Sequence, residues 1–358
     1  MIVDRRHAER FPRDLLAWFD IQGRRDLPWQ QKPTPYRVWV SEIMLQQTQV
    51  ATVIPYYQRF MEAFPSVAKL AEAPVDDVLH HWSGLGYYAR ARNLHRTARL
   101  VRDRHEGRFP ESFDDLLALP GIGRSTAGAV LALSGGQRYP ILDGNVKRVL
   151  CRYFALEGWP GRAQVAARLW EIADTLTPES RVQDYTQAIM DLGATVCRRT
   201  RPACEYCPIA SRCRARETET QVLYPTARPK RERPVRSATM VLALNGDGHV
   251  LLQRRDHDGL WGGLWSLPEV PQGADTASWC RERLGCPVTD ETIWPRVTHG
   301  FTHFELEITP HVIQIDREVP VIMDGDNWLW YNPESPARIG LAAVVSRLIA
   351  SLPETAET

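Results

Sequence analysis

The sequence predicts an all-α domain followed by a smaller α+β domain. Apolar residues recur at helical spacing through the first two thirds of the chain, whereas β patterns begin near residue 239. A segment rich in proline and arginine separates the two regions and resists a packed element. We therefore expect domains at residues 1–215 and 237–355, joined by a basic linker at residues 216–236.

The composition is that of a globular protein. Of the 358 residues, 44% are hydrophobic and 24% are charged, and the length suits two or three domains. The net charge of +1 does not exclude nucleic acid, because a near-zero sum can hide a basic face. No apolar run approaches the roughly 18–20 residues of a membrane span, and Met1–Arg10 lacks a signal-peptide core. We expect a cytoplasmic protein without a membrane partner.

Amphipathic spacing and capping residues predict the helices of the first domain. Thr34 can serve as N-cap of the first predicted helix, with Pro35 at its N1 position. The predicted helices are Thr34–Gln47, Asp76–Trp82, Ala89–Arg104, Phe113–Leu117, Thr126–Leu133, Val146–Ala155, Ala163–Leu176 and Val182–Val196. No convincing hairpin interrupts them.

A hairpin signal opens the second domain. Thr239–Leu244 and His249–Gln253 flank Asn-Gly-Asp-Gly, a sequence that favours a tight turn between two strands. The other expected elements are two strands and two helices, Phe304–Ile308, Val312–Ile315, Thr276–Leu284 and Leu341–Leu352.

Four cysteines cluster in a loop at residues 197–213 with the spacing C-x6-C-x2-C-x5-C. They are Cys197, Cys204, Cys207 and Cys213. Four thiolates this close can bind one centre, either a tetrahedral zinc ion or a [4Fe–4S] cluster. Zinc sites usually contain two C-x2-C pairs, and only Cys204 and Cys207 form one here. The spacing therefore favours one [4Fe–4S] cluster.

The run L-P-G-I-G at residues 119–123 joins two predicted helices within residues 112–133. Glycines permit a tight turn, and the backbone N–H groups of the turn and of the next helix can hold a phosphate. The longer run L-P-G-I-G-R-S-T-A-G-A resembles the helix–hairpin–helix of base-excision DNA glycosylases. This resemblance implies contact with duplex DNA.

Other motifs resemble one family in particular. They are L-P-W at 27–29, W-V-S-E-I-M-L-Q-Q-T at 39–48, G-L-G-Y-Y-A-R-A-R-N at 84–93 and L-D-G-N-V-K-R-V at 142–149. Together they resemble the adenine DNA glycosylase (MutY) family over nearly the whole chain. The resemblance implies an endonuclease III-like helical domain that excises adenine mispaired with 8-oxoguanine or guanine. We expect a monomer that acts at the nucleoid.

Excision of adenine requires a proton on the purine and negative charge beside the sugar, where an oxocarbenium ion develops. Two carboxylates in different environments can supply both, as in glycoside hydrolases. Glu42 lies among Trp39, Ile43 and Leu45, which would desolvate it and raise its pKa. Asp143 can also N-cap the helix that follows. The resemblance implies that Glu42 and Asp143 are both catalytic.

The resemblance assigns further residues to adenine and to DNA. Gln47 and Tyr87 match residues that wedge into the stack when a base flips out, although Tyr87 could equally be a packed aromatic. Ser125 stands where strand-cutting relatives carry an imine-forming lysine, so the reaction should stop at base removal. The adenine pocket is matched by Arg25, Leu27, Trp29, Asn145 and Gln187. Further DNA contacts are expected from Thr48, Gly121, Gly123, Ser125 and Lys147.

The second domain resembles a Nudix hydrolase that lacks its metal site. The run W-G-G-L-W-S-L-P-E at 261–269 resembles the start of that motif, but Trp279–Leu284 then offers one glutamate instead of several carboxylates. We expect a Nudix-like fold used for recognition. Phe301, Thr302 and His303 stand where the family has Phe-Ser-His, which senses 8-oxoguanine.

Three other functions compete with this one. A bifunctional endonuclease III-like pyrimidine glycosylase–lyase would need a lysine in place of Ser125. A nucleotide diphosphatase would need the missing carboxylates. A cluster-bearing DNA-binding protein without activity would leave Glu42 and Asp143 without a role.

Overall fold

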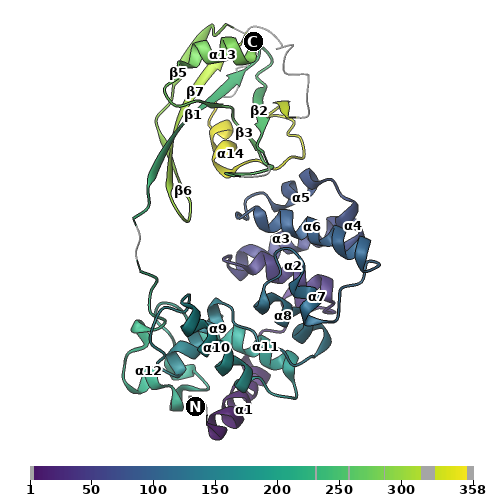
Figure 1. Cartoon of the computed structure of the whole chain (residues 1–358), viewed down its shortest axis with the longest axis vertical. Helices are drawn as coiled ribbons and strands as arrows, with labels where there is room; N and C mark the ends of the chain where they lie inside the picture. The colour runs from purple at the N-terminus through teal and green to yellow at the C-terminus, as the bar shows by residue number, and fades with distance from the viewer. Residues whose placement is uncertain (1–3, 230–231, 257–258, 286, 316–326, 353–358) are drawn as a thin grey trace. The chain divides into compact units, whose positions relative to one another are not determined.

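The computed structural model describes residues 4–229, 232–256, 259–285, 287–315 and 327–352 (Figure 1). The chain forms two compact units, one of residues 1–72 with 93–230 and one of residues 73–92 with 231–358. Residues 230–231 of the predicted linker and 353–355 of the predicted second domain lie outside the described residues. None of the described helices is long and apolar enough to cross a membrane.

The described part of the first unit is helical and contains no strand, which confirms the predicted all-α class. Helix α6 (Ala89–Arg104) starts in the other unit and enters this one at residue 93. The remaining helices are α1 (Arg5–Gln22), α2 (Pro35–Leu45), α3 (Val50–Ala63), α4 (Val67–Glu72), α7 (Phe113–Leu117), α8 (Arg124–Gly135), α9 (Gly144–Tyr153), α10 (Ala163–Leu176), α11 (Val182–Asp191) and α12 (Arg214–Glu217).

Helices α1, α9, α10 and α11 pack around one apolar core. Phe11 and Leu15 of α1 meet Leu150 of α9, Leu169 of α10 and Ile189 of α11, and each is at most 2% exposed. Burying side chains of this size contributes roughly 1.5–3 kcal/mol each. The core therefore holds α9 and α11 rigidly beneath the candidate site.

Side-chain caps mark the start of two helices, and the cap at Thr34 was predicted. The Thr34 hydroxyl accepts a hydrogen bond from Arg37 N, and Pro35 is the first residue of α2. The Ser112 hydroxyl likewise accepts from Asp115 N at the start of α7. These side chains satisfy N–H groups that have no partner within the helix.

The helix predicted over Val182–Val196 ends earlier. Helix α11 stops at Asp191, and residues 192–196 continue as a π-helical turn. Gly193 in that turn approaches α9 so closely that a Cβ there would lie 2.5 Å from the Asn145 Cβ. The close approach requires glycine, and such π turns often occur at functional sites.

Part of the predicted linker is ordered against the first unit. Gln221–Leu223 forms a 3-10 turn, and the carbonyl oxygens of Gln221 and Tyr224 accept hydrogen bonds from Arg152 Nε. The first strand of the second unit already begins at Val235.

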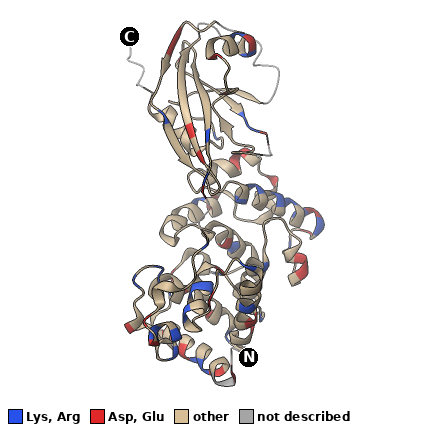
Figure 2. Ribbon diagram, turned by 60° about the vertical axis from the view of Figure 1, so that its left-hand side comes forward, with Lys and Arg blue, Asp and Glu red and all other residues tan. Residues whose placement is uncertain are grey.

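In the second unit, α5 (Val75–Trp82) and the start of α6 accompany a mixed sheet whose strands carry few charges (Figure 2). The strands are β1 (Val235–Leu244), β2 (Val250–Arg254), β3 (Trp265–Ser266), β4 (Glu269–Val270), β5 (Asp290–Ile293), β6 (Val297–Gly300), β7 (Glu305–Gln314) and β8 (Trp328–Tyr331), and the helices α13 (Thr276–Leu284) and α14 (Ala343–Ala350) complete the unit. The main path through the sheet is β3-β2-β1-β7-β5, with β1 parallel to β7. The predicted hairpin forms between β1 and β2, with Leu244 opposite Val250.

The two strands expected over Phe304–Ile308 and Val312–Ile315 are one strand, β7. Pro310, which lies between the two predicted segments, pairs with Met240 of β1 in an uninterrupted parallel ladder. On its other edge β7 pairs with β6 up to Ile308 and with β5 from His311 onward. Pro310 falls in the gap between these partners, where the missing N–H is tolerated.

Candidate active site

A cavity of about 1060 Å³ in the first unit collects both candidate catalytic residues and most residues predicted for the adenine pocket. It lies between α2, α8, the start of α9 and α11. The predicted residues that line it are Leu27, Trp29, Glu42, Gln47, Thr48, Ser125, Asp143, Asn145 and Gln187. Segments far apart in sequence therefore place both candidate carboxylates beside one space.

Glu42 enters this cavity from α2, between the buried residues Ser41 and Ile43. Burial and, second, the negative charge of Asp143 raise the pKa of Glu42 to about 8. Losing water disfavours the charged form of a carboxyl, and a nearby like charge adds to that effect. Glu42 thus carries a proton at neutral pH.

Asp143 occupies a polar position at the start of α9. Its Oδ1 accepts a hydrogen bond from Val146 N at 2.8 Å, and its Oδ2 accepts one from Asn145 Nδ2 at 3.2 Å. Burial raises the pKa of Asp143, while these hydrogen bonds and the charge of Arg148 oppose that rise. No side-chain hydrogen bond among the described residues reaches the Glu42 carboxyl. Asp143 is therefore the member of the pair that holds the negative charge, and it caps α9 as well.

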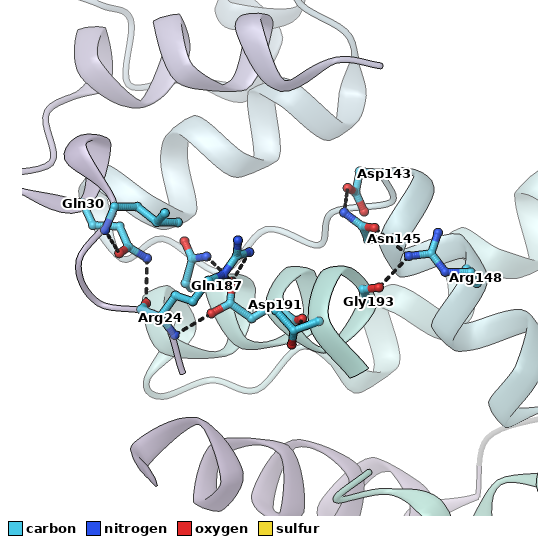
Figure 3. Close-up of polar contacts among 10 residues, drawn as sticks. Arg24, Gln30, Asp143, Asn145, Arg148, Gln187, Asp191 and Gly193 are labelled. Carbon is cyan, nitrogen blue, oxygen red and sulfur yellow. Dashed lines mark hydrogen bonds and ion pairs between the residues drawn. The ribbon is translucent and has the colours of Figure 1, made fainter. Parts of the chain in front are cut away.

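Arg148 connects Asn145 to the cysteine loop. Its Nη2 donates to Asn145 Oδ1 at 2.7 Å and to Gly193 O at 2.6 Å (Figure 3). Its Nε donates to Cys197 O at 2.7 Å. Because Arg148 only donates, it fixes the Asn145 amide with its NH₂ group toward Asp143.

The four clustered cysteines line one small cavity with Val149, Ile209 and Arg152. Arg152 is 3% exposed and donates to Cys197 Sγ at 3.4 Å and to Arg198 O at 2.7 Å. Among the described residues no group of three or more His, Cys, Asp or Glu side chains is arranged to hold a metal ion. Four sulfurs around a mainly apolar space, with a buried guanidinium beside them, fit an anionic cluster.

The hairpin between α7 and α8 leaves backbone N–H groups available. Gly121 has φ +77°, and a Cβ there would lie 2.9 Å from the Asn93 Cβ, so the turn requires glycine. Gly123 is the N-cap of α8 and offers no side-chain cap. The first N–H groups of α8 can therefore receive an anion. Ser125 Oγ accepts from Leu142 N at 3.0 Å, which ties α8 to the residue before Asp143.

Arg25 was predicted to line the adenine pocket, but Arg24, and not Arg25, is among the residues that line this cavity. Arg25 lies over the Phe19 ring and approaches Asp20 on the surface. Neighbouring side chains of an extended segment point to opposite sides, and Arg24 is the one that meets Asp191.

Tyr87, Gly121, Gly123 and Lys147 also lie outside the cavity lining. Tyr87 belongs to the second unit, has φ +49° and is 50% exposed. Sequence patterns did not single out Arg24, Arg148 or Asp191. A signal was available for Asp191: it follows Gln187 by four residues, which places the two side chains on one face of a helix.

In the second unit, Phe301, Thr302 and His303 form the turn between β6 and β7. Phe301 N donates to Phe304 O at 2.9 Å, and the two rings stack with centroids 4.7 Å apart. Trp261 packs on Phe301 at 5.5 Å. This aromatic support leaves Thr302 and His303 exposed.

Comparisons with known proteins match one family in the N-terminal part of the chain and another in the C-terminal part. A family described as HhH-GPD superfamily base excision DNA repair protein matches residues 40–175, and a NUDIX domain matches residues 239–351. An adenine DNA glycosylase of Buchnera aphidicola is 36% identical over 339 residues, which cover 95% of this chain and 96% of that protein. The adenine DNA glycosylase of Homo sapiens is 35% identical over 382 residues, which cover 89% of this chain and 70% of that protein.

Solved structures resemble the helical part. A thermostable thymine-DNA glycosylase aligns with 59% of this chain and 97% of its own, at a TM-score of 0.54 and 29% identity. Endonuclease III in a non-covalent DNA complex aligns with 61% of this chain and 99% of its own, at a TM-score of 0.52 and 20% identity. At that identity the second match shows the fold alone.

Proposed function

Because the chain belongs to the adenine DNA glycosylase family, we propose that it excises adenine paired with 8-oxoguanine or guanine in duplex DNA. The protein is a monofunctional DNA glycosylase of base excision repair, a hydrolase of N-glycosyl bonds. The observation that carries the proposal is the pair Glu42 and Asp143 beside one cavity, with the pKa of Glu42 raised to about 8.

The two carboxyl groups divide the reaction between them. Glu42 donates its proton to a ring nitrogen of the flipped adenine, which turns the base into a neutral leaving group. Asp143 remains ionised and stabilises the positive charge that develops at C1′ of the sugar. Water then adds to C1′ and leaves an abasic site. This is the division of labour between two carboxyls in glycoside hydrolysis.

Ser125 stops the reaction at this stage. A hydroxyl cannot form the imine through which lysine-bearing relatives cut the strand. The hydrogen bond from Leu142 N also commits the Ser125 oxygen to a structural contact.

The flipped nucleotide requires phosphate contacts and a filler for the emptied stack. The N-terminus of α8 and Lys147, in the first turn of α9, provide positive charge for the backbone. Gln47 at the mouth of the cavity has φ +60° and an exposed side chain, which suits a wedge. Tyr87 is a second exposed wedge candidate.

We assign Cys197, Cys204, Cys207 and Cys213 to one [4Fe–4S] cluster. Bound there, the cluster supplies a covalent anchor for the loop 197–213 and no step of base removal. Arg148 and Arg152 hold backbone oxygens of this loop, so the anchored loop supports the start of α9 where Asp143 lies.

Recognition of the opposite base falls to the second unit. Thr302 and His303 lie exposed on an aromatic-supported turn, where a hydroxyl and an imidazole can hydrogen-bond the 8-oxo edge of a base. Because duplex DNA is the substrate, we expect the protein to act in the compartment that holds the genome. We also expect it to be a monomer.

Duplexes with adenine opposite 8-oxoguanine, guanine or thymine test the proposal. We expect single-turnover excision of adenine opposite 8-oxoguanine and guanine, and little opposite thymine. Glu42→Gln and Asp143→Asn should each lose most excision and keep duplex affinity, because neither changes a phosphate contact. Near-normal excision by either variant would contradict the assignment.

A further inference from the structure

Asp191 accepts four hydrogen bonds from Arg24 and Gln187, two residues that line the cavity (Figure 3). Arg24 N donates to its Oδ2 at 2.8 Å, and Arg24 Nε and Nη2 donate to its Oδ1 at 3.0 and 2.6 Å. Gln187 Nε2 donates to the same Oδ1 at 2.7 Å. The Asp191 side chain is 1% exposed. A carboxylate this buried is stabilised by its hydrogen-bond partners and has no access to other groups.

The contact with Asp191 fixes which end of the Gln187 amide faces the cavity. An ionised carboxylate accepts hydrogen bonds and cannot donate them, so the NH₂ group of Gln187 must point toward Asp191. Gln187 lines the cavity and lies one helical turn before Asp191 on α11. Its Oε1 is thereby presented as a fixed acceptor.

Asp191 also holds the segment that carries Leu27 and Trp29, which line the same cavity. The carbonyl oxygen of Arg24 accepts from Gln30 Nε2 at 3.0 Å, and Gln30 Oε1 accepts from Leu27 N at 3.1 Å. The loop that carries Leu27 and Trp29 is therefore tied to α11 through Arg24.

We propose that Asp191 is a positioning residue that makes the cavity select bases with an exocyclic amino group. Adenine offers N6–H donors to the Gln187 oxygen. Hypoxanthine has a carbonyl oxygen at C6, and two acceptors facing each other leave both unsatisfied. The inference rests on the proposed placement of the flipped adenine in this cavity.

The test compares Asp191→Asn with the unchanged protein on three duplexes that share one partner base. The excised base is adenine, hypoxanthine, or purine, which has no substituent at C6. The amide that this substitution introduces can donate to Gln187, so the glutamine amide can turn and offer its NH₂ to the cavity. We expect the single-turnover rate on adenine to fall at least tenfold and the rate on hypoxanthine to change less than threefold.

Asp184→Asn is the matched control on the same helix. Asp184 pairs with Arg181 on the surface, at 2.8 Å and away from the cavity, and its loss should leave all three rates unchanged. A uniform fall of the three rates in Asp191→Asn would overturn the proposal, because a purely structural defect does not distinguish bases.

A second variant decides the matter if Asp191→Asn does not fold. Gln187→Met keeps the shape of the side chain and removes the acceptor, so the ratio of adenine to purine excision should fall about tenfold. An unchanged ratio would overturn the proposal. Glu42→Gln distinguishes a failure of the proposed active site from a failure of the role of Asp191. If Glu42→Gln still excises adenine, the proposed active site is wrong. If Glu42→Gln is inactive, the tests above concern only the role of Asp191.

Discussion

Glu42 is protonated at neutral pH because its pKa is raised to about 8, mainly by burial. A general acid works only in its protonated form. We therefore expect the single-turnover excision rate to fall as pH rises through about 8, approaching a tenfold loss per further pH unit. Rates on one fixed duplex between pH 6 and 10 provide the measurement. A rate that stays flat to pH 10 would contradict the role of Glu42.

The same raised pKa makes stability depend on pH. Between the ordinary value of 4.5 and about 8 the folded protein binds the Glu42 proton and the unfolded chain does not. Folding stability contributed by this group is therefore present below the ordinary value and is lost as pH rises toward 8. Glutamine does not ionise, so Glu42→Gln should gain stability over the unchanged protein between pH 5 and pH 9, by about 4 kcal/mol.

Urea unfolding of the two proteins at pH 5 and pH 9 measures this difference. Glu62→Gln, on the exposed face of α3, serves as control and should show no such change with pH. If the difference for Glu42→Gln is equal at both pH values, the carboxyl ionises as freely in the folded protein as in the unfolded chain.

The positions of several site residues were predictable from the sequence. Glu42, Asp143 and Gln187 line the cavity as expected. Chemistry singled out the two carboxyls, whereas the family resemblance supplied Gln187. Arg25 was predicted at the cavity in place of Arg24, because sequence does not show which of two adjacent side chains turns inward. Asp191 was missed for a related reason: an acid on an amphipathic helix normally faces water, and only the distant Arg24 explains its burial.

At the scale of elements, local signals located helices better than strands. Ala89–Arg104, Phe113–Leu117, Ala163–Leu176 and Thr276–Leu284 have the predicted bounds, because spacing and caps act within a few residues. The continuity of β7 depends on partners far away in sequence. No local pattern could show that Pro310 falls between two of them.

The loop 197–213, which carries the four clustered cysteines, should bind iron. The protein should purify with about four irons per chain if its four thiolates hold a [4Fe–4S] cluster. Cys204→Ser should lose iron and duplex affinity together, since the loop 197–213 then loses its anchor. Metal analysis and a duplex binding titration measure the two effects.

Cys280→Ser is the control, because this buried cysteine lies in the sheet unit. Iron content and affinity should remain unchanged in it. Stoichiometric zinc without iron, in protein prepared anaerobically from iron-replete cells, would decide for a zinc site instead.

For the whole molecule, the grouping of residues 73–92 with the C-terminal residues was not visible in the sequence. Within that unit, Asp76 pairs with Arg254 at 2.9 Å, and the Tyr88 hydroxyl donates to Leu341 O at 3.1 Å. A Cβ on Gly340 would lie 2.7 Å from the Leu79 Cβ, so α5 packs tightly there. The exposed wedge candidate Tyr87 is thus carried by a segment that the C-terminal residues support.

The second unit is also relevant to how the enzyme avoids excising adenine from normal pairs with thymine. A flipped adenine is chemically identical whether it faced thymine or 8-oxoguanine, so the cavity around Glu42 cannot tell the two apart. Discrimination must come from the opposite base. Truncation after Tyr224 should therefore keep adenine excision but lower the preference for 8-oxoguanine over guanine.

His303→Ala in the full chain should lower the same preference less, by about 1–2 kcal/mol if one hydrogen bond to the damaged base is lost. Thr302→Ser is the matched control, because it keeps the hydroxyl and should retain the preference. Single-turnover rates on the two pairs give the preference for each protein. If truncation slows both pairs by the same factor, the second unit stabilises the enzyme without reading the lesion, and His303 should then be silent as well.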